Sequence, residues 1–211
     1  MNGEDAVGIS GGSAAGRVVE IYQRHAGAWT SDRSDELFEK TWLDRFFALL
    51  PDRLRVLDIG CGNGVPIARY LIARRCQVTG VDASSAMIAM CAQRFAEHEW
   101  HVADMRTLAL SRTFDGILAW DSVFHLTQAD QRRMFPIFGR HATAGAALMF
   151  TSGTSAGEQI GSHHGEPLYH ASLDSDEYRS LLHDNGFDVV THVAEDPSCG
   201  EHSIWLAKRR R

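Results

Sequence analysis

A short glycine turn is the first feature of this sequence that could do chemistry. Residues 56–64, with the sequence VLDIGCGNG, run from an apolar strand pattern directly into three closely spaced glycines. Glycines permit a tight turn and let a ligand approach the backbone, and the helix that follows offers free N–H groups that favour a carboxylate or a phosphate. The spacing is GxGxG, and Val65 stands where a dinucleotide-binding GxGxxG turn has its third glycine. We therefore expect a ligand-binding turn that does not hold a pyrophosphate in the dinucleotide manner, or else a purely structural strand-to-helix turn.

Two aspartates close the next two predicted strands. Asp82 follows the glycine turn by about 20 residues, where a carboxylate can accept hydrogen bonds from the two hydroxyls of a ribose. Asp104 closes the third strand, and a carboxylate there can accept from an exocyclic amine such as that of adenine. Either aspartate alone could instead cap a helix or a turn. At three successive strand ends, the turn and the two acids favour one ligand site over three unrelated local roles.

The fourth predicted strand ends in a segment that could act on a substrate. Residues 120–125 read WDSVFH and should lie at the edge of the same cleft. Asp121 could orient a substrate or support the first ligand, and His125, with an ordinary pKa near 6.5, could remove a proton from an oxygen or nitrogen nucleophile. In the alternative interpretation His125 caps the turn and packs on Trp120. We predict Asp121 and His125 as the catalytic residues.

A long stretch, residues 152–172, is rich in glycine and histidine. A loop of this length in a compact domain is usually a lid or a binding loop, and this one follows the fifth predicted strand on the ligand side. Tyr169 and His170 lie nearest the next predicted helix and are expected to bind substrate. Two adjacent histidines near Glu166 could hold a metal, but the glycines around them favour a solvated loop, so we predict no metal site.

The elements that must position these residues alternate along the chain. Apolar periodicity, capping residues and breakers predict helices over residues 17–29, 34–50, 66–75, 84–96, 128–141 and 173–185. Short apolar runs predict strands over residues 55–59, 77–81, 100–103, 114–120, 146–151, 187–193 and 203–208. This order implies an α/β fold, a doubly wound and mostly parallel sheet with helices on both faces. The last two strands have no helix between them, so they should be antiparallel.

The motif set resembles the class I S-adenosylmethionine-dependent methyltransferases, from about residue 55 to residue 209. The resemblance implies a Rossmann-like seven-stranded sheet with an antiparallel last strand. It also implies S-adenosyl-L-methionine as cofactor and S-adenosyl-L-homocysteine as product. It assigns Asp58 and the glycine turn to the methionine moiety, Asp82 to the ribose, and Asp104 with the Met105 backbone to adenine. The expected cofactor-binding residues are Tyr22, Trp29, Asp58, Gly60, Cys61, Gly62, Asn63, Gly64, Asp82, Ala83, Asp104, Met105 and Asp121.

The N-terminal segment is expected to divide into two parts. Residues 1–16 are glycine-rich and polar, which predicts a flexible leader. Residues 17–211 should form a single domain, in which the helices within residues 17–50 cover the cofactor cleft. Tyr22 and Trp29 would then close over the cofactor, as the corresponding helix often does in related enzymes, although aromatic residues at helical spacing can equally be core packing.

Composition limits the partners that such an enzyme could have. The 211 residues carry 21 lysines and arginines against 27 aspartates and glutamates, a net charge of −6, so we expect no nucleic acid or membrane partner. Four cysteines without metal-site or disulfide spacing suit the reducing cytoplasm. We expect a monomer or homodimer that methylates an oxygen or nitrogen of a small molecule. The alternatives are a nicotinamide-dependent reductase and a non-catalytic cofactor-binding protein.

Overall fold

The computed structural model describes residues 11–32, 36–51 and 54–211. Helices and strands alternate through most of the chain. The helices are α1 (Gly11–Asp32), α2 (Lys40–Leu49), α3 (Ile67–Ala73), α4 (Ser85–Arg94), α5 (Gln128–His141) and α6 (Ser175–Asp184), with short 3₁₀ turns η1 (Met105–Thr107), η2 (Val123–His125) and η3 (Pro197–Cys199). The strands are β1 (Arg55–Ile59), β2 (Gln77–Asp82), β3 (Glu99–Val102), β4 (Phe114–Ala119), β5 (Ala142–Ser152), β6 (Gly157–His163), β7 (Glu166–Ser172), β8 (Phe187–Asp196) and β9 (His202–Arg209).

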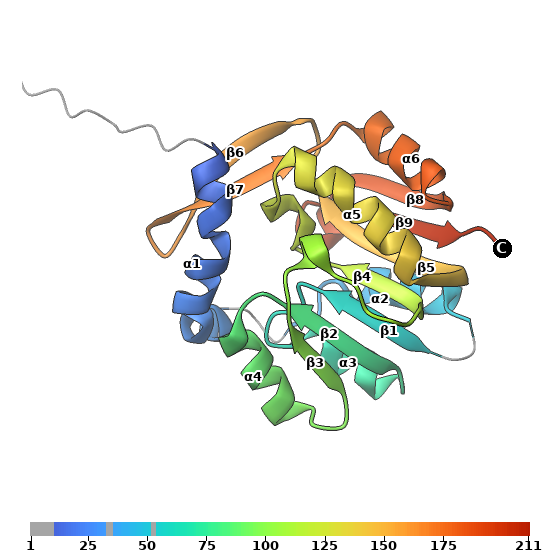
Figure 1. Ribbon diagram of the computed structural model, residues 1–211, viewed down its shortest axis with the longest axis horizontal. Helices are drawn as coiled ribbons and strands as arrows, with labels where there is room; N and C mark the ends of the chain where they lie inside the picture. The colour runs from blue at the N-terminus through green and yellow to red at the C-terminus, as the bar shows by residue number, and fades with distance from the viewer. Residues whose placement is uncertain (1–10, 33–35, 52–53) are drawn as a thin grey trace, which may run out of the picture.

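Seven of these strands form one sheet in the order β3-β2-β1-β4-β5-β9-β8 (Figure 1). Strands β1 to β5 run parallel to one another, whereas β9 is antiparallel to both β5 and β8. The sheet confirms the predicted doubly wound α/β fold and its reversed last strand. Because β9 runs the other way, its first residues lie at the edge where the parallel strands end.

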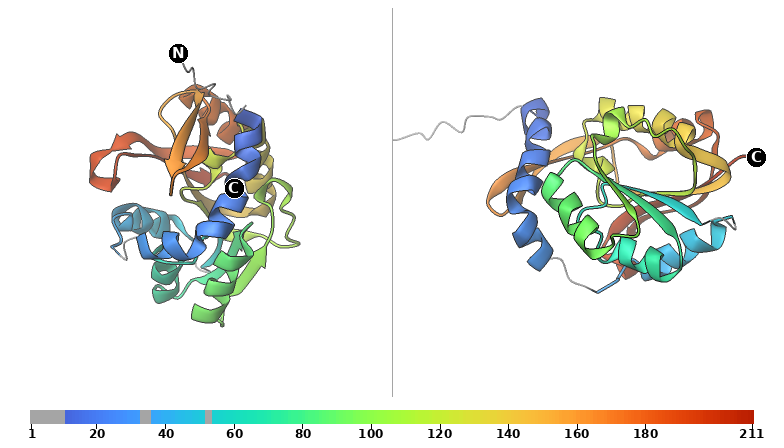
Figure 2. Two further views of the ribbon diagram at one scale, coloured as in Figure 1. Left: turned by 90° about the vertical axis from the view of Figure 1, so that its left-hand side faces the viewer. Right: turned by 60° about the horizontal axis from the view of Figure 1, so that its bottom comes forward.

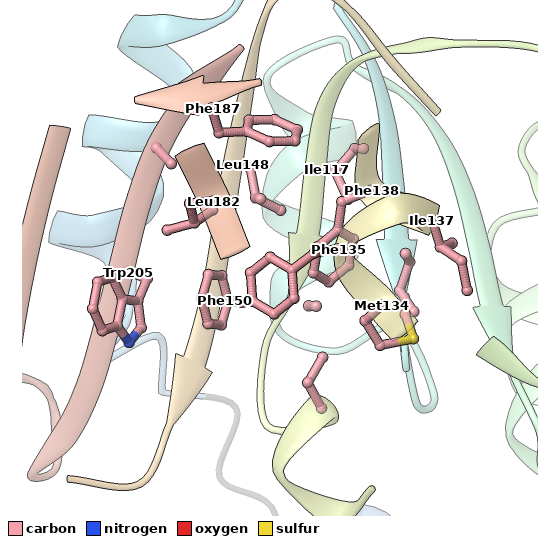
Figure 3. Packing of buried hydrophobic residues seen from close by; sticks show 14 of the residues in the cluster. Ile117, Met134, Phe135, Ile137, Phe138, Leu148, Phe150, Leu182, Phe187 and Trp205 are labelled. Carbon is pink, nitrogen blue, oxygen red and sulfur yellow. The ribbon is translucent and has the colours of Figure 1, made fainter. Parts of the chain in front are cut away.

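The sheet is buried by helices on both faces. On one face, α5 and α6 pack against β1, β4, β5 and β9, and their contact includes the rings of Phe135, Phe138, Phe150 and Trp205 (Figure 3). On the other face, α2 and α3 cover the same strands through a second cluster that includes Trp42. The apolar stripes of the sequence thus correspond to helix faces that lie on the sheet. Among the described helices, none has the length and apolar character that crossing a bilayer requires.

The stretch over residues 152–172, predicted as a loop, is largely a β-hairpin. Strands β6 and β7 pair antiparallel from Gly157 with Ser172 to His163 with Glu166. Most of β6 is exposed, so its sequence carries no apolar alternation that would reveal a strand. The expectation of a loop without strands was wrong because strand pairing, rather than burial, orders this segment.

Helix α1 lies across the end of the molecule that carries this hairpin (Figure 2). Its buried residues Ala14, Val18 and Ile21 pack on Leu168 and Ala171 of β7. The helix begins at Gly11, so the described residues of the predicted leader, 11–16, are helical, and residues 1–10 lie outside the described part of the chain. Tertiary packing on β7 offsets the low helix propensity of the glycines here.

The second helix is shorter than predicted. Helix α2 begins at Lys40, and residues 33–35 of the predicted helix 34–50 lie outside the described chain. Its buried residues Trp42, Leu43 and Phe46 face the sheet rather than the ligand edge.

Candidate active site

A cavity of about 390 Å³ opens at the carboxyl end of the parallel strands, underneath α1. This is where ligands bind in open α/β sheets, and the volume lies within the range of small-molecule sites. Most of the predicted cofactor residues line it: Tyr22, Trp29, Asp58, Gly60, Cys61, Gly62, Gly64, Asp82, Ala83, Asp104, Met105 and Asp121. The predicted catalytic His125 and the predicted substrate residue His170 line it as well.

The glycine turn is pressed against the end of β4. Gly60 has φ +78°, and a Cβ added there would lie 2.3 Å from Cβ of Ser122, closer than real side chains approach. Ser122 in turn donates its hydroxyl to the Ile59 carbonyl at 2.8 Å. The N–H groups of Gly60 and Cys61 donate to the Val81 carbonyl at the end of β2. Glycine at position 60 is therefore required by both backbone conformation and space.

Asp82 organises the turn from the end of β2. Its Oδ2 accepts from the N–H of Gly62 at 3.0 Å, and its Oδ1 accepts from the N–H of Ser84 at 2.8 Å. Burial raises the pKa of this carboxyl, and the backbone hydrogen bonds oppose that rise. A carboxylate can accept about four hydrogen bonds, so Asp82 keeps acceptor capacity for a ligand.

Asp58 is the most buried carboxyl in the cavity wall, and the register of β1 places it between Gly80 of β2 and Leu118 of β4. Burial, followed by the nearby charge of Asp82, raises the pKa of Asp58 from 3.8 to about 7. A positively charged group in the cavity would lower that pKa again. The site is therefore suited to a ligand with a cationic end.

Asp104 lies at the opposite side of the cavity and already has a partner. Arg106 donates from Nε to both carboxyl oxygens at 3.0 Å and from its second terminal nitrogen at 2.6 Å. This hydrogen bonding lowers the pKa of Asp104 despite partial burial. Asp104 is thus ionised and held in place, and its contact with an adenine amine stays a prediction.

Two aromatic residues of α1 close the cavity. The Trp29 ring lies over the glycine turn, with Cη2 3.5 Å from the position that a Cβ of Gly62 would take. Tyr22 lies deeper, its ring 6.5 Å from that of Trp29, and burial raises the pKa of its hydroxyl above the ordinary value of 10. The geometry places both residues where α1 could cover a bound ligand. Among its described residues, α2 contributes nothing to the lining.

His125 has both ring nitrogens engaged. Nδ1 lies 2.9 Å from the Tyr169 carbonyl oxygen, and Nε2 lies 3.0 Å from the Tyr22 hydroxyl. A carbonyl only accepts, so Nδ1 carries the proton and donates it, and Nε2 accepts from Tyr22. Burial lowers the pKa of His125 from 6.5 to about 4. The residue predicted as the general base is therefore neutral, with its lone pair directed at a tyrosine.

Asp121 pairs with a histidine that the sequence analysis did not select. His202 Nε2 lies 2.9 Å from Asp121 Oδ1, and its Nδ1 lies 2.8 Å from the Cys199 carbonyl. Acceptors lie at both nitrogens of His202, which favours the imidazolium. Burial lowers the pKa of His202, but the hydrogen bond and charge of Asp121 outweigh burial and raise the pKa above its ordinary value. His202 lines the cavity because it begins β9. The predicted antiparallel strand was the signal that could have found it.

Two predicted residues lie outside the cavity wall. Asn63 is buried, and its Oδ1 accepts from the N–H of Val65 at 2.9 Å, inside the turn. Tyr169 is fully buried among the apolar residues between α1 and β7, and it reaches the site through its carbonyl alone. Glu166, weighed as a metal ligand, binds His25 of α1 at 2.6 Å. Asn63, Tyr169 and Glu166 therefore contact the elements that form the cavity but do not line it.

Comparison with known proteins identifies a methyltransferase domain within the chain. Residues 56–145 match the family described as a methyltransferase domain. The chain is 35% identical over 114 residues to a malonyl-[acyl-carrier protein] O-methyltransferase of Enterobacter lignolyticus, covering 53% of this chain and 40% of that one. It is 34% identical over 113 residues to the 27-O-demethylrifamycin SV methyltransferase of Amycolatopsis mediterranei, covering 48% and 41%. The chain thus spans about two fifths of the length of both relatives.

Solved structures with a similar fold are methyltransferases as well. A solved structure of the 1,6-didemethyltoxoflavin-N1-methyltransferase of Burkholderia thailandensis superposes with a TM-score of 0.75 at 19% identity, covering 99% of this chain and 94% of that one. That structure holds S-adenosylhomocysteine. These matches favour neither a reductase nor a non-catalytic binding protein. Residues 56–145 thus match a methyltransferase domain, and the chain has the fold of S-adenosylmethionine-dependent methyltransferases.

Proposed function

We propose that this protein transfers a methyl group from S-adenosyl-L-methionine to an oxygen or nitrogen of a small-molecule acceptor, with S-adenosyl-L-homocysteine as the other product. The main support for the proposal is that the glycine turn, Asp82 and Asp104 line one and the same cavity beneath α1. The toxoflavin-related structure binds a small molecule beside the same cofactor product. A cavity of about 390 Å³ suits partners of that size.

The residues of the cavity fit the cofactor. Asp82 would accept the two ribose hydroxyls with its remaining acceptor capacity, and Asp104 with the Met105 backbone would accept from and donate to adenine. The glycine turn and Asp58 would receive the charged methionine end, because a buried carboxyl gains a cationic partner there. When bound, the cofactor supplies a methyl carbon activated by a positively charged sulfur. Tyr22 and Trp29 would exclude water from that part of the cavity.

The other end of the cavity would hold the acceptor. Asp121 and His202, both in the lining, would face it from the sheet, and His170 would face it from the hairpin. Methyl transfer needs the acceptor in line with the methyl group, and such positioning can supply about 7–11 kcal/mol of the barrier. The residues of this chain would then mainly orient the acceptor, and one of them would accept the proton that the acceptor loses.

The finer properties of the protein form part of the same proposal. Net charge −6 and an enclosed cavity support a small-molecule acceptor rather than nucleic acid or a membrane surface. None of the four cysteines, all within the described residues, forms a disulfide, which supports a reducing, cytoplasmic location. We propose a single methyltransferase domain from residue 17 onward that works as a monomer or homodimer.

Calorimetric titration with S-adenosylhomocysteine tests the cofactor site, and a metabolite library screened for cofactor-dependent product release tests the transfer. We expect saturable binding at one site per chain and methylated product from at least one small molecule. Tight binding of reduced nicotinamide cofactor in place of S-adenosylhomocysteine would contradict the proposal. Methylation confined to a protein or nucleic acid would contradict the acceptor class.

Cofactor affinity should depend on pH through Asp58. The pKa of Asp58 is higher in the folded protein than in the unfolded chain, so folding favours the protonated carboxyl. The contribution of Asp58 to the free energy of unfolding is therefore fully present below pH 3.8 and is lost as the pH rises through about 7. A cationic ligand favours the ionised form, so the affinity for S-adenosylhomocysteine should rise about tenfold from pH 6 to pH 8. Titration in buffers of different ionisation enthalpy should show proton release at pH 7. Asp58→Asn should remove both effects, and a flat profile in the unaltered protein would contradict the assignment.

His125 should act as a positioning residue for Tyr22. His125→Ala removes the acceptor of the Tyr22 hydroxyl and leaves a buried donor unpaired, which costs about 1–3 kcal/mol. We expect turnover to fall about tenfold to a hundredfold, with S-adenosylhomocysteine still bound. His125→Gln restores an acceptor oxygen and should recover part of the loss. Equal losses in both variants would speak against the hydrogen bond as the cause.

A further inference from the structure

His170 lies in the cavity with its ring held on both sides. It belongs to β7 and lines the cavity wall. Its ring centroid is 4.8 Å from that of His125 and 5.4 Å from that of Phe124. These contacts fix the plane of the imidazole, so its nitrogens point in defined directions.

One edge of the His170 ring is directed into the hairpin. Gly161 lies beside this edge. A Cβ added to Gly161 would be 3.4 Å from Nδ1 of His170 and 3.7 Å from the Leu168 carbonyl oxygen. His170 hydrogen-bonds to that carbonyl. Nδ1 is the ring nitrogen on the hairpin side, and a carbonyl can only accept, so we assign the proton to Nδ1 and the lone pair of the neutral ring to Nε2.

The two cavity histidines therefore differ in what they offer a ligand. In His125 the Nε2 lone pair accepts from Tyr22. In His170, Nδ1 lies toward the hairpin, and the residue lines the cavity, so Nε2 is the nitrogen assigned to a ligand. Burial lowers the pKa of His170, while the Leu168 carbonyl and the charge of Asp121 partly restore it. His170 is thus neutral at pH 7 and able to take a proton.

We propose that Nε2 of His170, rather than His125, accepts the proton of the acceptor during methyl transfer. This inference rests on the function proposed above. The bond that forms joins the acceptor oxygen or nitrogen to the methyl carbon. The bond that breaks is the carbon–sulfur bond, whose electron pair remains on sulfur, and the acceptor's proton moves to Nε2. The Asp121 carboxylate stabilises the imidazolium that results.

The tautomer can be tested without an acceptor. Protein labelled with ¹⁵N-histidine and saturated with S-adenosylhomocysteine is titrated from pH 5 to pH 8, with His170→Asn and His125→Gln used to assign signals. We expect His170 to show the Nδ1–H tautomer and to titrate on Nε2 within this range, while His125 stays neutral throughout. A His170 ring protonated on Nε2 when neutral, or one that does not titrate, would overturn the proposal.

The proton transfer is tested with an acceptor found in the metabolite screen. His170→Asn keeps an amide donor near the position of Nδ1 and removes Nε2, and His170→Gln is the second variant. Loss of a general base typically costs about 10²–10⁴-fold in rate. We expect kcat to fall at least about 100-fold in both variants, with S-adenosylhomocysteine affinity within about twofold of the unaltered protein.

The pH profile separates a base from a structural role. In the unaltered protein kcat should decline at acidic pH, at a point below the ordinary histidine pKa because burial lowers the pKa of His170, and this limb should disappear in His170→Asn. The titratable groups that line the cavity with His170 are Tyr22, Asp58, Cys61, Asp82, Asp104, Arg106, Asp121, His125, Asp130 and His202. Exposed His183 gives the matched control, and His183→Gln should change nothing.

Full kcat with an unchanged profile in His170→Asn would refute the proposal. A protein that binds no S-adenosylhomocysteine would instead refute the proposed function. If the protein binds this ligand but no acceptor is found, the histidine titration still decides the tautomer on which the inference depends.

Discussion

Replacing Asp82 by alanine is expected to lower the affinity for S-adenosylhomocysteine by at least about 100-fold. Hydrogen bonds to a charged group contribute about 1.5–3 kcal/mol each, and the proposed contact has two. The same substitution removes the acceptor of the Gly62 and Ser84 N–H groups, so the turn loses its support together with the ribose contact. Calorimetric titration at pH 8, where carboxyl protonation interferes least, measures the change.

Two variants show whether the Asp82 effect is local. Asp188→Ala makes the same change of charge at an exposed carboxylate that pairs with Arg210 at 2.9 Å, outside the cavity, and it should leave the affinity unchanged. Asp82→Asn keeps an acceptor oxygen without the charge, and an intermediate affinity is expected. Unchanged binding in Asp82→Ala would remove this residue from the cofactor site.

Replacing Gly60 by alanine is expected to destabilise the protein by about 2–5 kcal/mol. A left-handed backbone costs a non-glycine residue about 1–2 kcal/mol, and overpacking in a close-packed region adds about 1–3 kcal/mol. Both apply here, because Gly60 has φ +78° and its Cβ would lie 2.3 Å from that of Ser122. Urea unfolding followed by tryptophan fluorescence gives the free energy of unfolding.

Gly145 provides the matched control for this substitution. Its φ is +77°, nearly that of Gly60, but a Cβ added there would meet no atom within 4 Å. Gly145→Ala should therefore cost about 1–2 kcal/mol, from the backbone alone. The difference between the two variants isolates the contact between the turn and the end of β4. Equal losses would mean that Ser122 moves aside without cost, and the tight packing of the turn would then be of no consequence.

The strands that carry the cofactor residues could be predicted because their signals are local. Strand β1 was predicted at its observed bounds, since an apolar run before a glycine turn has few alternatives. The hairpin β6–β7 could not be predicted in this way. Its first strand buries no side chain fully, and its order comes from pairing with β7 and from α1, which packs on β7 from more than a hundred residues earlier in the chain.

The same distinction applies to the histidines. The sequence marks His125 by its place after a strand, and it marks His170 by its place before a helix. Neither position discloses which ring nitrogen is free, because the partners of His125 are Tyr22 and Tyr169, 103 and 44 residues away. His202 was overlooked because its pairing with Asp121 spans 81 residues and depends on the reversal of β9.

By itself, the sequence determined the alternation of strands and helices, the glycine turn, and the acidic residues at the strand ends. These depend on near neighbours in the chain, through periodicity, backbone freedom and capping. Tertiary structure alone decided that α1 closes the cavity, that Asp121 pairs with His202, and that both ring nitrogens of His125 are hydrogen-bonded. The physical reason is that burial and hydrogen bonding set the protonation of a side chain, and both come from segments that meet only in the folded protein.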